Sequence, residues 1–333
     1  MPGNFRAFKI LVAAQYNGVG VAVPDLILIL YAASLLWLCL HMDARGALHN
    51  FDTALGLPLP EKTYGDKCEL AWENVKAVVL DRFVLAHTGG WICGTMLLRD
   101  VNVAWVVSIL FELLEITFTH WQPNFEECWW DRVVVDVLIC NALGIYAGRK
   151  LLQTFCVPTF DWFGPRQPVK IMSIPLTIPL VLRCPRRFCC VLLLTATVSL
   201  MMLNAFFLKA ALRVPCAHWL NAARLALWYC TSPAAWPEHY ALITRHASSD
   251  SCSAAAKQTT LHWRVTLCSV TIALESGLCF TLRRDTFAAP WPSAVVSAWA
   301  WAASAIGLYV IMLWRFQQHG NRNLAVTAAK KRG

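Results

Sequence analysis

The chain has 333 residues, of which 57% are hydrophobic and only 15% are charged. A typical soluble domain is about 45–50% apolar and about 25% charged, so this composition argues against a soluble fold and favours a membrane protein. The formal net charge is +9. Because the basic residues lie in short segments between apolar runs, they indicate membrane topology and contact with anionic lipid, and we predict no nucleic-acid partner.

Apolar runs of membrane-spanning length recur along the chain. A transmembrane helix needs about 20 mostly apolar residues. Six runs meet this requirement well: Val19–Leu40, Val101–Thr119, Val133–Leu152, Phe188–Leu208, Trp263–Leu282 and Ala294–Trp314. Two weaker runs are Phe83–Leu98 and Trp219–Trp236. We therefore predict an all-α fold, a multi-pass transmembrane helical bundle of about 8 helices that forms a single integral membrane domain over residues 1–333.

The 14 cysteines form neither a C-x-x-C pair nor the Cys/His spacing of a zinc site. Most of them lie within the apolar runs, where cysteine behaves as a small hydrophobic residue. We therefore expect no structural disulfide framework.

Acidic residues concentrate between residues 81 and 141, and several of them lie inside apolar runs: Asp81, Asp100, Glu112, Glu115, Glu126, Glu127, Asp131 and Asp136. A charged group at the centre of a membrane helix costs about 2.5–3.5 kcal/mol on insertion scales, so each such acid is a functional-site hypothesis by default. We predict that residues 81–141 form the catalytic acidic helices.

The spacing of these acids predicts two acidic helix faces. Glu112 and Glu115 are three residues apart and Glu127 and Asp131 are four apart, so each pair shares a helix face. The segment Gln122–Phe125 contains a proline and must interrupt the helix, which predicts a hairpin whose acidic faces meet. Carboxylates packed so closely need a cation among them, and all-oxygen ligands favour Ca²⁺ over Mg²⁺ or Zn²⁺.

His87 lies in the weaker run Phe83–Leu98 and is followed closely by Gly89 and Gly90. A lone histidine in such a run is usually a packed residue, but its nearness to the acids also suggests general acid–base catalysis, and both interpretations remain open. The two glycines would allow close approach of a helix or a lipid tail. Arg99 ends the run, where it could bind a phosphate or anchor the helix at the interface.

Several catalytic motifs are absent from the sequence. There is no G-x-x-x-x-G-K-[ST], so the chain does not use nucleotides through a P-loop, and there is no H-E-x-x-H or G-x-S-x-G. The sequence also lacks D-G-x-x-A-R followed by G-x-x-x-D-x-x-x-D, the pattern by which CDP-alcohol phosphotransferases are known. A member of that class is therefore disfavoured.

Three strings in the acidic stretch form a distinctive pattern. They are F-E-L-L-E at residues 111–115, P-N-F-E-E-C-W-W-D at residues 123–131 and D-V-L-I-C-N at residues 136–141. With these strings the chain resembles the eukaryotic base-exchange phosphatidylserine synthases. The second string is the most specific of the three, and the resemblance extends over about residues 50–315.

The resemblance implies a Ca²⁺-dependent enzyme of the endoplasmic reticulum membrane that replaces the ethanolamine or choline head group of a phospholipid with L-serine, without CTP. Such an exchange is nearly isoenergetic and needs no nucleotide, in agreement with the missing P-loop. A metal would polarise the phosphoryl oxygen, with His87 as the base or, alternatively, as a covalent phospho-histidine. The competing function is a cation transporter or channel whose midplane acids form the ion path.

The resemblance also assigns roles to individual residues. It implies catalytic roles for His87, Glu112, Asn124, Asp136 and Asn141. It implies that Ca²⁺ is held by Glu112, Glu115, Glu127 and Asp131. Basic residues expected at phosphate or lipid are Arg99, Lys209 and Arg224. The expected partners are phospholipid and L-serine substrates and membrane lipids, and a homodimer is a further hypothesis.

The segment 315–333 is a basic tail that contains no acidic residue. Basic residues beside the last apolar run favour a cytosolic C-terminus. Lys330 and Lys331 occupy the positions of a dilysine retrieval signal, whose alternative interpretation is an ordinary basic tail. We expect a multi-pass protein of the endoplasmic reticulum membrane with its C-terminus in the cytosol.

Overall fold

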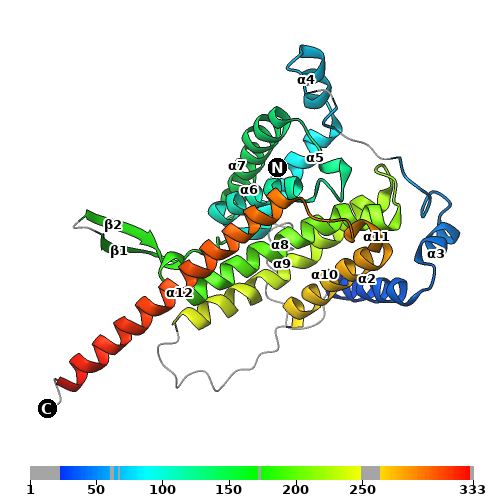
Figure 1. Ribbon diagram of the computed structural model, residues 1–333. Helices are drawn as coiled ribbons and strands as arrows, with labels where there is room; N and C mark the ends of the chain where they lie inside the picture. The colour runs from blue at the N-terminus through cyan, green and yellow to red at the C-terminus, as the bar shows by residue number, and fades with distance from the viewer. Residues whose placement is uncertain (1–22, 61–63, 67, 172–173, 249–262, 331–333) are drawn as a thin grey trace. The chain divides into compact units, whose positions relative to one another are not determined.

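The computed structural model describes residues 23–60, 64–66, 68–171, 174–248 and 263–330. These residues are mostly helical (Figure 1). The helices longer than two turns are α2 (Val23–Leu40), α3 (Ala44–Phe51), α4 (Trp72–Val79), α5 (Arg82–Leu98), α6 (Val101–Phe118), η2 (Asp131–Asn141), α7 (Ala142–Thr154), α8 (Pro185–Leu212), α9 (Trp219–Ser248), α10 (Trp263–Leu282) and α12 (Ser293–Lys330). The shorter ones are η1 (Pro123–Phe125), η3 (Leu180–Leu182) and α11 (Arg284–Phe287).

The predicted all-α, multi-pass membrane bundle is confirmed. All eight apolar runs form helices, although the start of the first, residues 19–22, lies outside the described residues. Within the described residues five helical segments are long and apolar enough to cross a membrane: Val23–Leu40, Val101–Phe118, Pro185–Leu212, Trp263–Leu282 and Ser293–Arg315. The segment Phe83–Leu98 is a shorter apolar helix.

The chain forms two compact units, each assembled from separated segments. The first contains Met1–Phe160, Ala196–Tyr240 and Thr260–Ala289, and the second contains Asp161–Thr195, Ala241–Thr259 and Pro290–Gly333. Helix α8 contributes residues to both units. The single membrane domain that we expect over residues 1–333 stays a prediction.

Within the first unit, α5 packs closely against α7 because α7 presents two glycines to it. A Cβ atom on Gly144 would lie 2.5 Å from Cβ of Trp91, and one on Gly148 would lie 2.8 Å from the carbonyl oxygen of Ile92. Glycines four residues apart let helix backbones approach in this way. At the two glycines of α5, a Cβ on Gly89 would contact nothing within 4 Å and one on Gly90 would lie 3.9 Å from the Tyr229 hydroxyl, so neither makes a close helix contact and room for a lipid tail stays a prediction.

A cluster of buried apolar side chains holds the remaining helices of the first unit together. It includes Leu35 of α2, Phe111 of α6, Phe207 of α8 and Leu278 of α10. Helix α10 also packs along α2. These contacts join segments that are far apart in the sequence, as expected when each helix buries part of its apolar surface against its neighbours.

A disulfide bond joins Cys68 to Cys128, which corrects the expectation of no structural disulfide. Next to it, Tyr64 and Glu127 form an isolated parallel β-bridge, and the Tyr64 N–H donates to the carbonyl oxygen of Glu126 at 3.0 Å. The disulfide and the bridge together fasten the segment before α4 to the segment that carries Glu127.

The second unit contains the strands that the sequence did not predict. Strands β1 (Arg166–Ile171) and β2 (Ile174–Pro179) form an antiparallel hairpin in which Arg166 pairs with Pro179. Helix α12 continues beyond the predicted end of its apolar run at Trp314 and includes the basic tail as far as Lys330. The last residues of the tail, 331–333, lie outside the described residues.

Candidate active site

Helix η2 is a π-helix, and its geometry brings three predicted site residues onto one face. Asp131, Asp136 and Asn141 are spaced five residues apart. In an α-helix residues with this spacing point in different directions, but a π-helix closes hydrogen bonds from i to i+5, so they lie one above another. All three side chains are buried, and Asn141 is fully enclosed. π-Helical turns occur frequently at functional sites.

Three predicted catalytic residues are joined in a hydrogen-bonded chain. His87 Nε2 lies 2.6 Å from Asn141 Oδ1, and Asn141 Nδ2 donates to Glu112 Oε1 at 3.2 Å. The same amide donates to Ser108 Oγ at 2.7 Å. On the other side of the imidazole, His87 Nδ1 lies 3.7 Å from Asp136 Oδ1. The structure therefore brings His87, Glu112, Asp136 and Asn141 together from α5, α6 and η2.

These contacts indicate the tautomer of His87. An ionised Glu112 can only accept hydrogen bonds, so the Asn141 amide must turn its NH₂ group to Glu112 and its oxygen to His87. His87 Nε2 must then carry the hydrogen, which leaves the lone pair of Nδ1 facing Asp136. The Trp91 indole N–H is directed at the same nitrogen from 3.2 Å and can donate to it only in the other tautomer, so the assignment follows the shorter contact, to Asn141.

The acidic residues are crowded around a single nearby cation. Electrostatic interactions connect Glu112, Glu115, Glu127 and Asp136 with one another and with Arg132. Arg132 lies 3.9 Å from Glu127 Oε2 and donates to the carbonyl oxygen of Phe125 at 2.7 Å. Burial, followed by the charge of Asp136, raises the pKa of Glu127 to about 8. Burial and the neighbouring acids therefore oppose ionisation of Glu127 in spite of the charge of Arg132.

Two carboxylate oxygens of the cluster, Glu112 Oε2 and Glu127 Oε2, are buried and accept no hydrogen bond. Buried polar atoms without a hydrogen bond are rare in native proteins, and a cation bound beside them is one explanation. Over the described residues, no three His, Cys, Asp or Glu side chains are already arranged as a metal site. The donors are nevertheless all oxygens, which suits Ca²⁺, and its flexible coordination tolerates side chains that adjust on binding.

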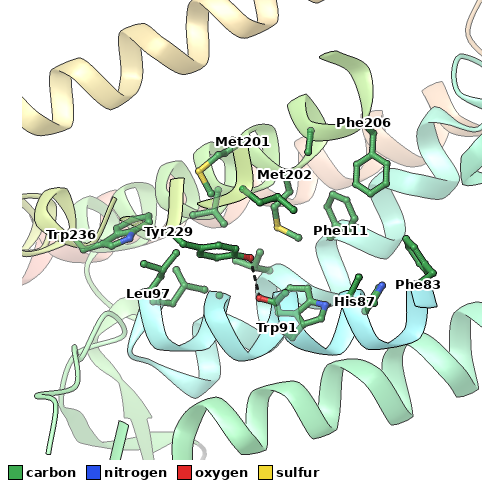
Figure 2. Close-up of a pocket in the computed structure, with 18 residues that line it drawn as sticks. Phe83, His87, Trp91, Leu97, Phe111, Met201, Met202, Phe206, Tyr229 and Trp236 are labelled. Atoms are coloured by element: carbon green, nitrogen blue, oxygen red, sulfur yellow. Dashed lines mark hydrogen bonds between the residues drawn. The ribbon is translucent and has the colours of Figure 1, made fainter. Parts of the chain in front are cut away.

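An apolar cavity of about 250 Å³ lies against His87 on the side of α8 and α9 (Figure 2). Its wall includes Trp91, Phe111, Met202 and Tyr229, and the Tyr229 hydroxyl donates to the carbonyl oxygen of Gly90 at 3.3 Å. His87 therefore contacts two different environments, a carboxylate cluster and a cavity lined by hydrocarbon and aromatic groups. A polar cluster next to an apolar cavity is suited to an amphiphilic molecule with a polar head and an apolar tail.

A family model described as "Phosphatidyl serine synthase" matches residues 23–277, which is more than half of the chain. The chain belongs to the phosphatidyl serine synthase family. The resemblance inferred from the sequence strings is therefore confirmed.

Three family members illustrate the similarity. The chain is 39% identical over 208 residues to the CDP-diacylglycerol--serine O-phosphatidyltransferase 1 of Arabidopsis thaliana, with 56% of this chain and 49% of the relative covered. It is 29% identical over 301 residues to enzyme 2 of the same description from Oryza sativa subsp. japonica, covering 83% and 68%. It is 34% identical over 223 residues to phosphatidylserine synthase 2 of Homo sapiens, covering 60% and 45%. The chain spans about half the length of several relatives it matches.

In this family member, the other predicted site residues lie outside the His87 network. Asn124 and Lys209 line a second, polar cavity at the ends of α8 and α10. Arg99 is buried at the end of α5, where it donates to the carbonyl oxygen of Pro158 at 3.4 Å and stacks over Phe160. Arg224 is bound to a carboxylate, with its Nη2 2.6 Å from Glu275 Oε2. Their assignments to catalysis, phosphate or lipid stay predictions.

The sequence analysis missed two residues of the site. Ser108 precedes Glu112 by one helical turn and fixes the Asn141 amide, and Arg132 supplies the positive charge beside the acids. Both could have been noticed from spacing, since Ser108 shares a helix face with Glu112 and Arg132 follows Asp131 directly.

Proposed function

We propose that this protein exchanges the head group of a membrane phospholipid for L-serine. The observation that carries the proposal is the position of His87 between the carboxylate cluster and the apolar cavity. The cavity offers room for part of a lipid tail next to a candidate base, while the cluster offers a site for the cation that this reaction would use. The family membership of the chain supports the same class of product.

In the proposed reaction His87 Nδ1 accepts the proton of the serine hydroxyl as the serine oxygen bonds to phosphorus. The bond between phosphorus and the departing alcohol breaks, and the same proton passes from His87 to that alcohol. Asp136, at 3.7 Å, stabilises the transient imidazolium. Asn141, held by Glu112 and Ser108, keeps the ring in the tautomer that the proton transfer requires.

We propose Glu112, Glu115, Glu127 and Asp131 as the Ca²⁺ ligands. Their mutual electrostatic interaction and the two carboxylate oxygens that accept no hydrogen bond support this assignment. When bound, Ca²⁺ would supply positive charge that offsets the charge developing on the phosphoryl oxygens. Binding would also neutralise a group of acids that is otherwise unfavourable in a membrane.

A second candidate donor is CDP-diacylglycerol, because three plant relatives are described as CDP-diacylglycerol--serine O-phosphatidyltransferases. The absence of the CDP-alcohol phosphotransferase pattern favours exchange. The test is incorporation of labelled serine by purified protein in vesicles of phosphatidylethanolamine, phosphatidylcholine or CDP-diacylglycerol, with and without Ca²⁺. Incorporation only with CDP-diacylglycerol would replace the exchange reaction, and cation flux without incorporation would favour a transporter.

We also propose an orientation in the endoplasmic reticulum membrane. The basic tail favours the cytosol for the C-terminus, and disulfides form in oxidising compartments such as the reticulum lumen. Arg283 at the end of α10 lines the same cavity as Tyr64 beside the disulfide, so we propose that this end of α10 faces the lumen. A tag at the C-terminus that stays protected after selective permeabilisation of the plasma membrane would contradict this orientation.

A further inference from the structure

The first unit contains a second cavity, of about 570 Å³, which shares no lining residue with the apolar cavity beside His87. It lies where several helices end: Lys209 and Arg213 come from the end of α8, Arg45 from α3, and Arg283 from the turn after α10. Four basic side chains thus line one cavity, and Asp285 is the acidic residue on its wall.

Neutral oxygen atoms hold the arginines of this cavity in place. Arg45 donates from Nε to the carbonyl oxygen of Ala211 at 2.9 Å and from Nη2 to that of Leu282 at 2.7 Å. Arg283 donates from Nη1 to the side-chain oxygen of Gln122 at 2.6 Å. The contacts of Arg45 fix the direction of its guanidinium group without cancelling its charge.

The positive charges are also close enough to oppose one another. Burial, together with the charges of Arg213 and Arg283, lowers the pKa of Arg45, and the charge of Asp43 offsets this only in part. Among the described residues no carboxylate forms an ion pair with Arg45, Lys209 or Arg213. Crowded cations that carry no carboxylate partner are stabilised by an anion between them.

The position of the cavity indicates what kind of anion it receives. Lys209 lies in the last turn of α8, at one end of a span long and apolar enough to cross a membrane, and α10 ends beside it at Leu282. The ends of spanning helices lie at the depth of lipid head groups. A cavity of this size accepts a group as large as a phosphorylated head group, and Arg and Lys are the usual ligands of phosphate.

We propose that Arg45, Lys209, Arg213 and Arg283 form a phosphate-binding site that is separate from the His87 site. Its ligand carries a phosphate group, either in a lipid head group or in a water-soluble phosphate ester. The Lys209 ammonium group makes the most adaptable contact, because the hydrogen bond it forms in this structure is to the sulfur of Cys216 at 3.4 Å.

Lys209→Gln tests the proposal on the purified full-length chain. Binding of glycerol 3-phosphate and inorganic phosphate is measured by calorimetry in detergent, and binding of phosphatidic acid is measured by mass spectrometry in nanodiscs. Loss of one charge-assisted contact should weaken binding about tenfold, and added salt should weaken it further. Lys209→Arg should retain binding. Lys150→Gln is the matched control, because Lys150 is exposed on α7 away from this cavity.

Comparison of the lipid probe with the soluble probes identifies the source of the phosphate. Binding of phosphatidic acid alone assigns the site to a lipid, and binding of glycerol 3-phosphate assigns it to a soluble ester. Equal affinity of the wild type and Lys209→Gln would overturn the proposal, as would a wild type that binds none of the three probes. His87→Gln, which removes the proposed base, should leave this binding unchanged. A failure of the exchange reaction is therefore distinguishable from a failure of this site.

Discussion

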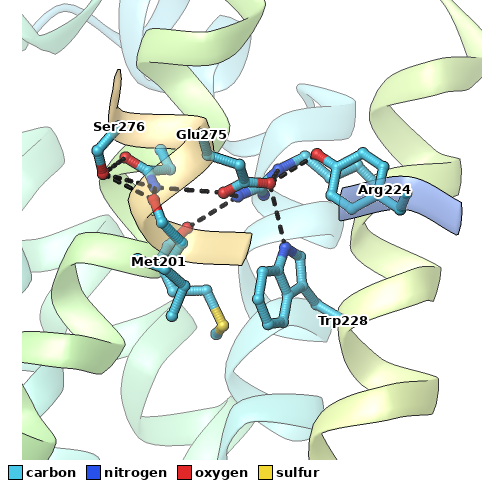
Figure 3. A network of polar contacts seen from close by, with 8 residues as sticks. Met201, Arg224, Trp228, Glu275 and Ser276 are labelled. Atoms are coloured by element: carbon cyan, nitrogen blue, oxygen red, sulfur yellow. Dashed lines mark hydrogen bonds and ion pairs between the residues drawn. The ribbon is translucent and has the colours of Figure 1, made fainter. Parts of the chain in front are cut away.

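Two of the buried polar centres in the first unit differ in how completely their charges are matched. In one, Glu275 is fully enclosed and its carboxylate receives Arg224 Nε at 2.8 Å, Arg224 Nη2 at 2.6 Å and the Tyr31 hydroxyl at 2.6 Å (Figure 3). Trp228 Nε1 and Asn204 Nδ2 complete the set, at 3.4 and 3.2 Å. This centre joins α2, α8, α9 and α10 and has no unpartnered carboxylate oxygen.

The other centre, around His87, has the opposite character. Several carboxyl groups share one nearby cation, Arg132, and the oxygens Glu112 Oε2 and Glu127 Oε2 accept no hydrogen bond. A buried charge that is fully paired holds helices in register, whereas a buried group without a partner costs free energy that a purely structural role would not justify. The comparison supports a structural role for the Glu275 centre and agrees with the proposal that the His87 centre binds a cation and substrates.

Removal of Ca²⁺ should have the largest effect and should affect only the His87 centre. An excess of chelator should abolish serine incorporation while the protein stays folded. Saturating Ca²⁺ should also stabilise the wild type, by about 2.7 kcal/mol at a hundredfold excess over Kd, and this gain should shrink in Glu127→Gln. Glu126→Gln is the control, because Glu126 is exposed. Full activity in excess chelator would contradict the assignment of Ca²⁺.

Replacement of the proposed base should have the next largest effect. His87→Gln should lower turnover about 10²–10⁴-fold, because a positioned proton acceptor contributes that much to a reaction of this kind. Thermal stability and Ca²⁺ binding should change little. His41→Gln is a suitable control, since His41 is exposed. Turnover close to that of the wild type would mean that His87 is a packed residue of α5.

Disruption of the Glu275 centre should instead reduce stability. Glu275→Ala leaves the buried Arg224 without its carboxylate, which should lower the free energy of unfolding by about 3–5 kcal/mol. Chemical denaturation in detergent measures this change. The double variant Arg224→Met/Glu275→Leu should recover much of the loss, because it removes both charges. A Glu275→Ala protein of normal stability but without activity would reverse the roles assigned to the two centres.

Much of the fold could be predicted from the sequence, because a membrane helix is encoded in one continuous apolar run. The acidic stretch was equally readable, since carboxylates inside apolar runs are costly wherever the helices lie. The relation of Asp131, Asp136 and Asn141 was not, because an α-helical period separates residues five apart and the π-helix aligns them. Their regular spacing was visible, but nothing in it identifies a π-helix.

Features that depend on distant residues could not be predicted. Cys68 and Cys128 are 60 residues apart in sequence, and their pairing depends on how the segment beside Tyr64 returns to Glu127. The role of Arg224 depends in the same way on Glu275, from another helix.

The smallest predicted effect concerns the packing of α7 against α5, which sets the distance between Asn141, just before α7, and His87 on α5. Gly144 lies about one helical turn after Asn141. A Cβ added to Gly144 would lie 2.5 Å from Cβ of Trp91 and 2.7 Å from the carbonyl oxygen of Thr88. Gly144→Ala should therefore separate α5 from α7, cost about 1–3 kcal/mol of stability and lower turnover, because the 2.6 Å contact between His87 and Asn141 would lengthen. Gly277→Ala in α10 is the matched control: an added Cβ there meets nothing within 4 Å, so the better helix former should raise stability slightly. Denaturation and serine incorporation measured on both variants check the prediction, and an equal response of the two would mean that close packing at Gly144 does not determine the geometry of the site.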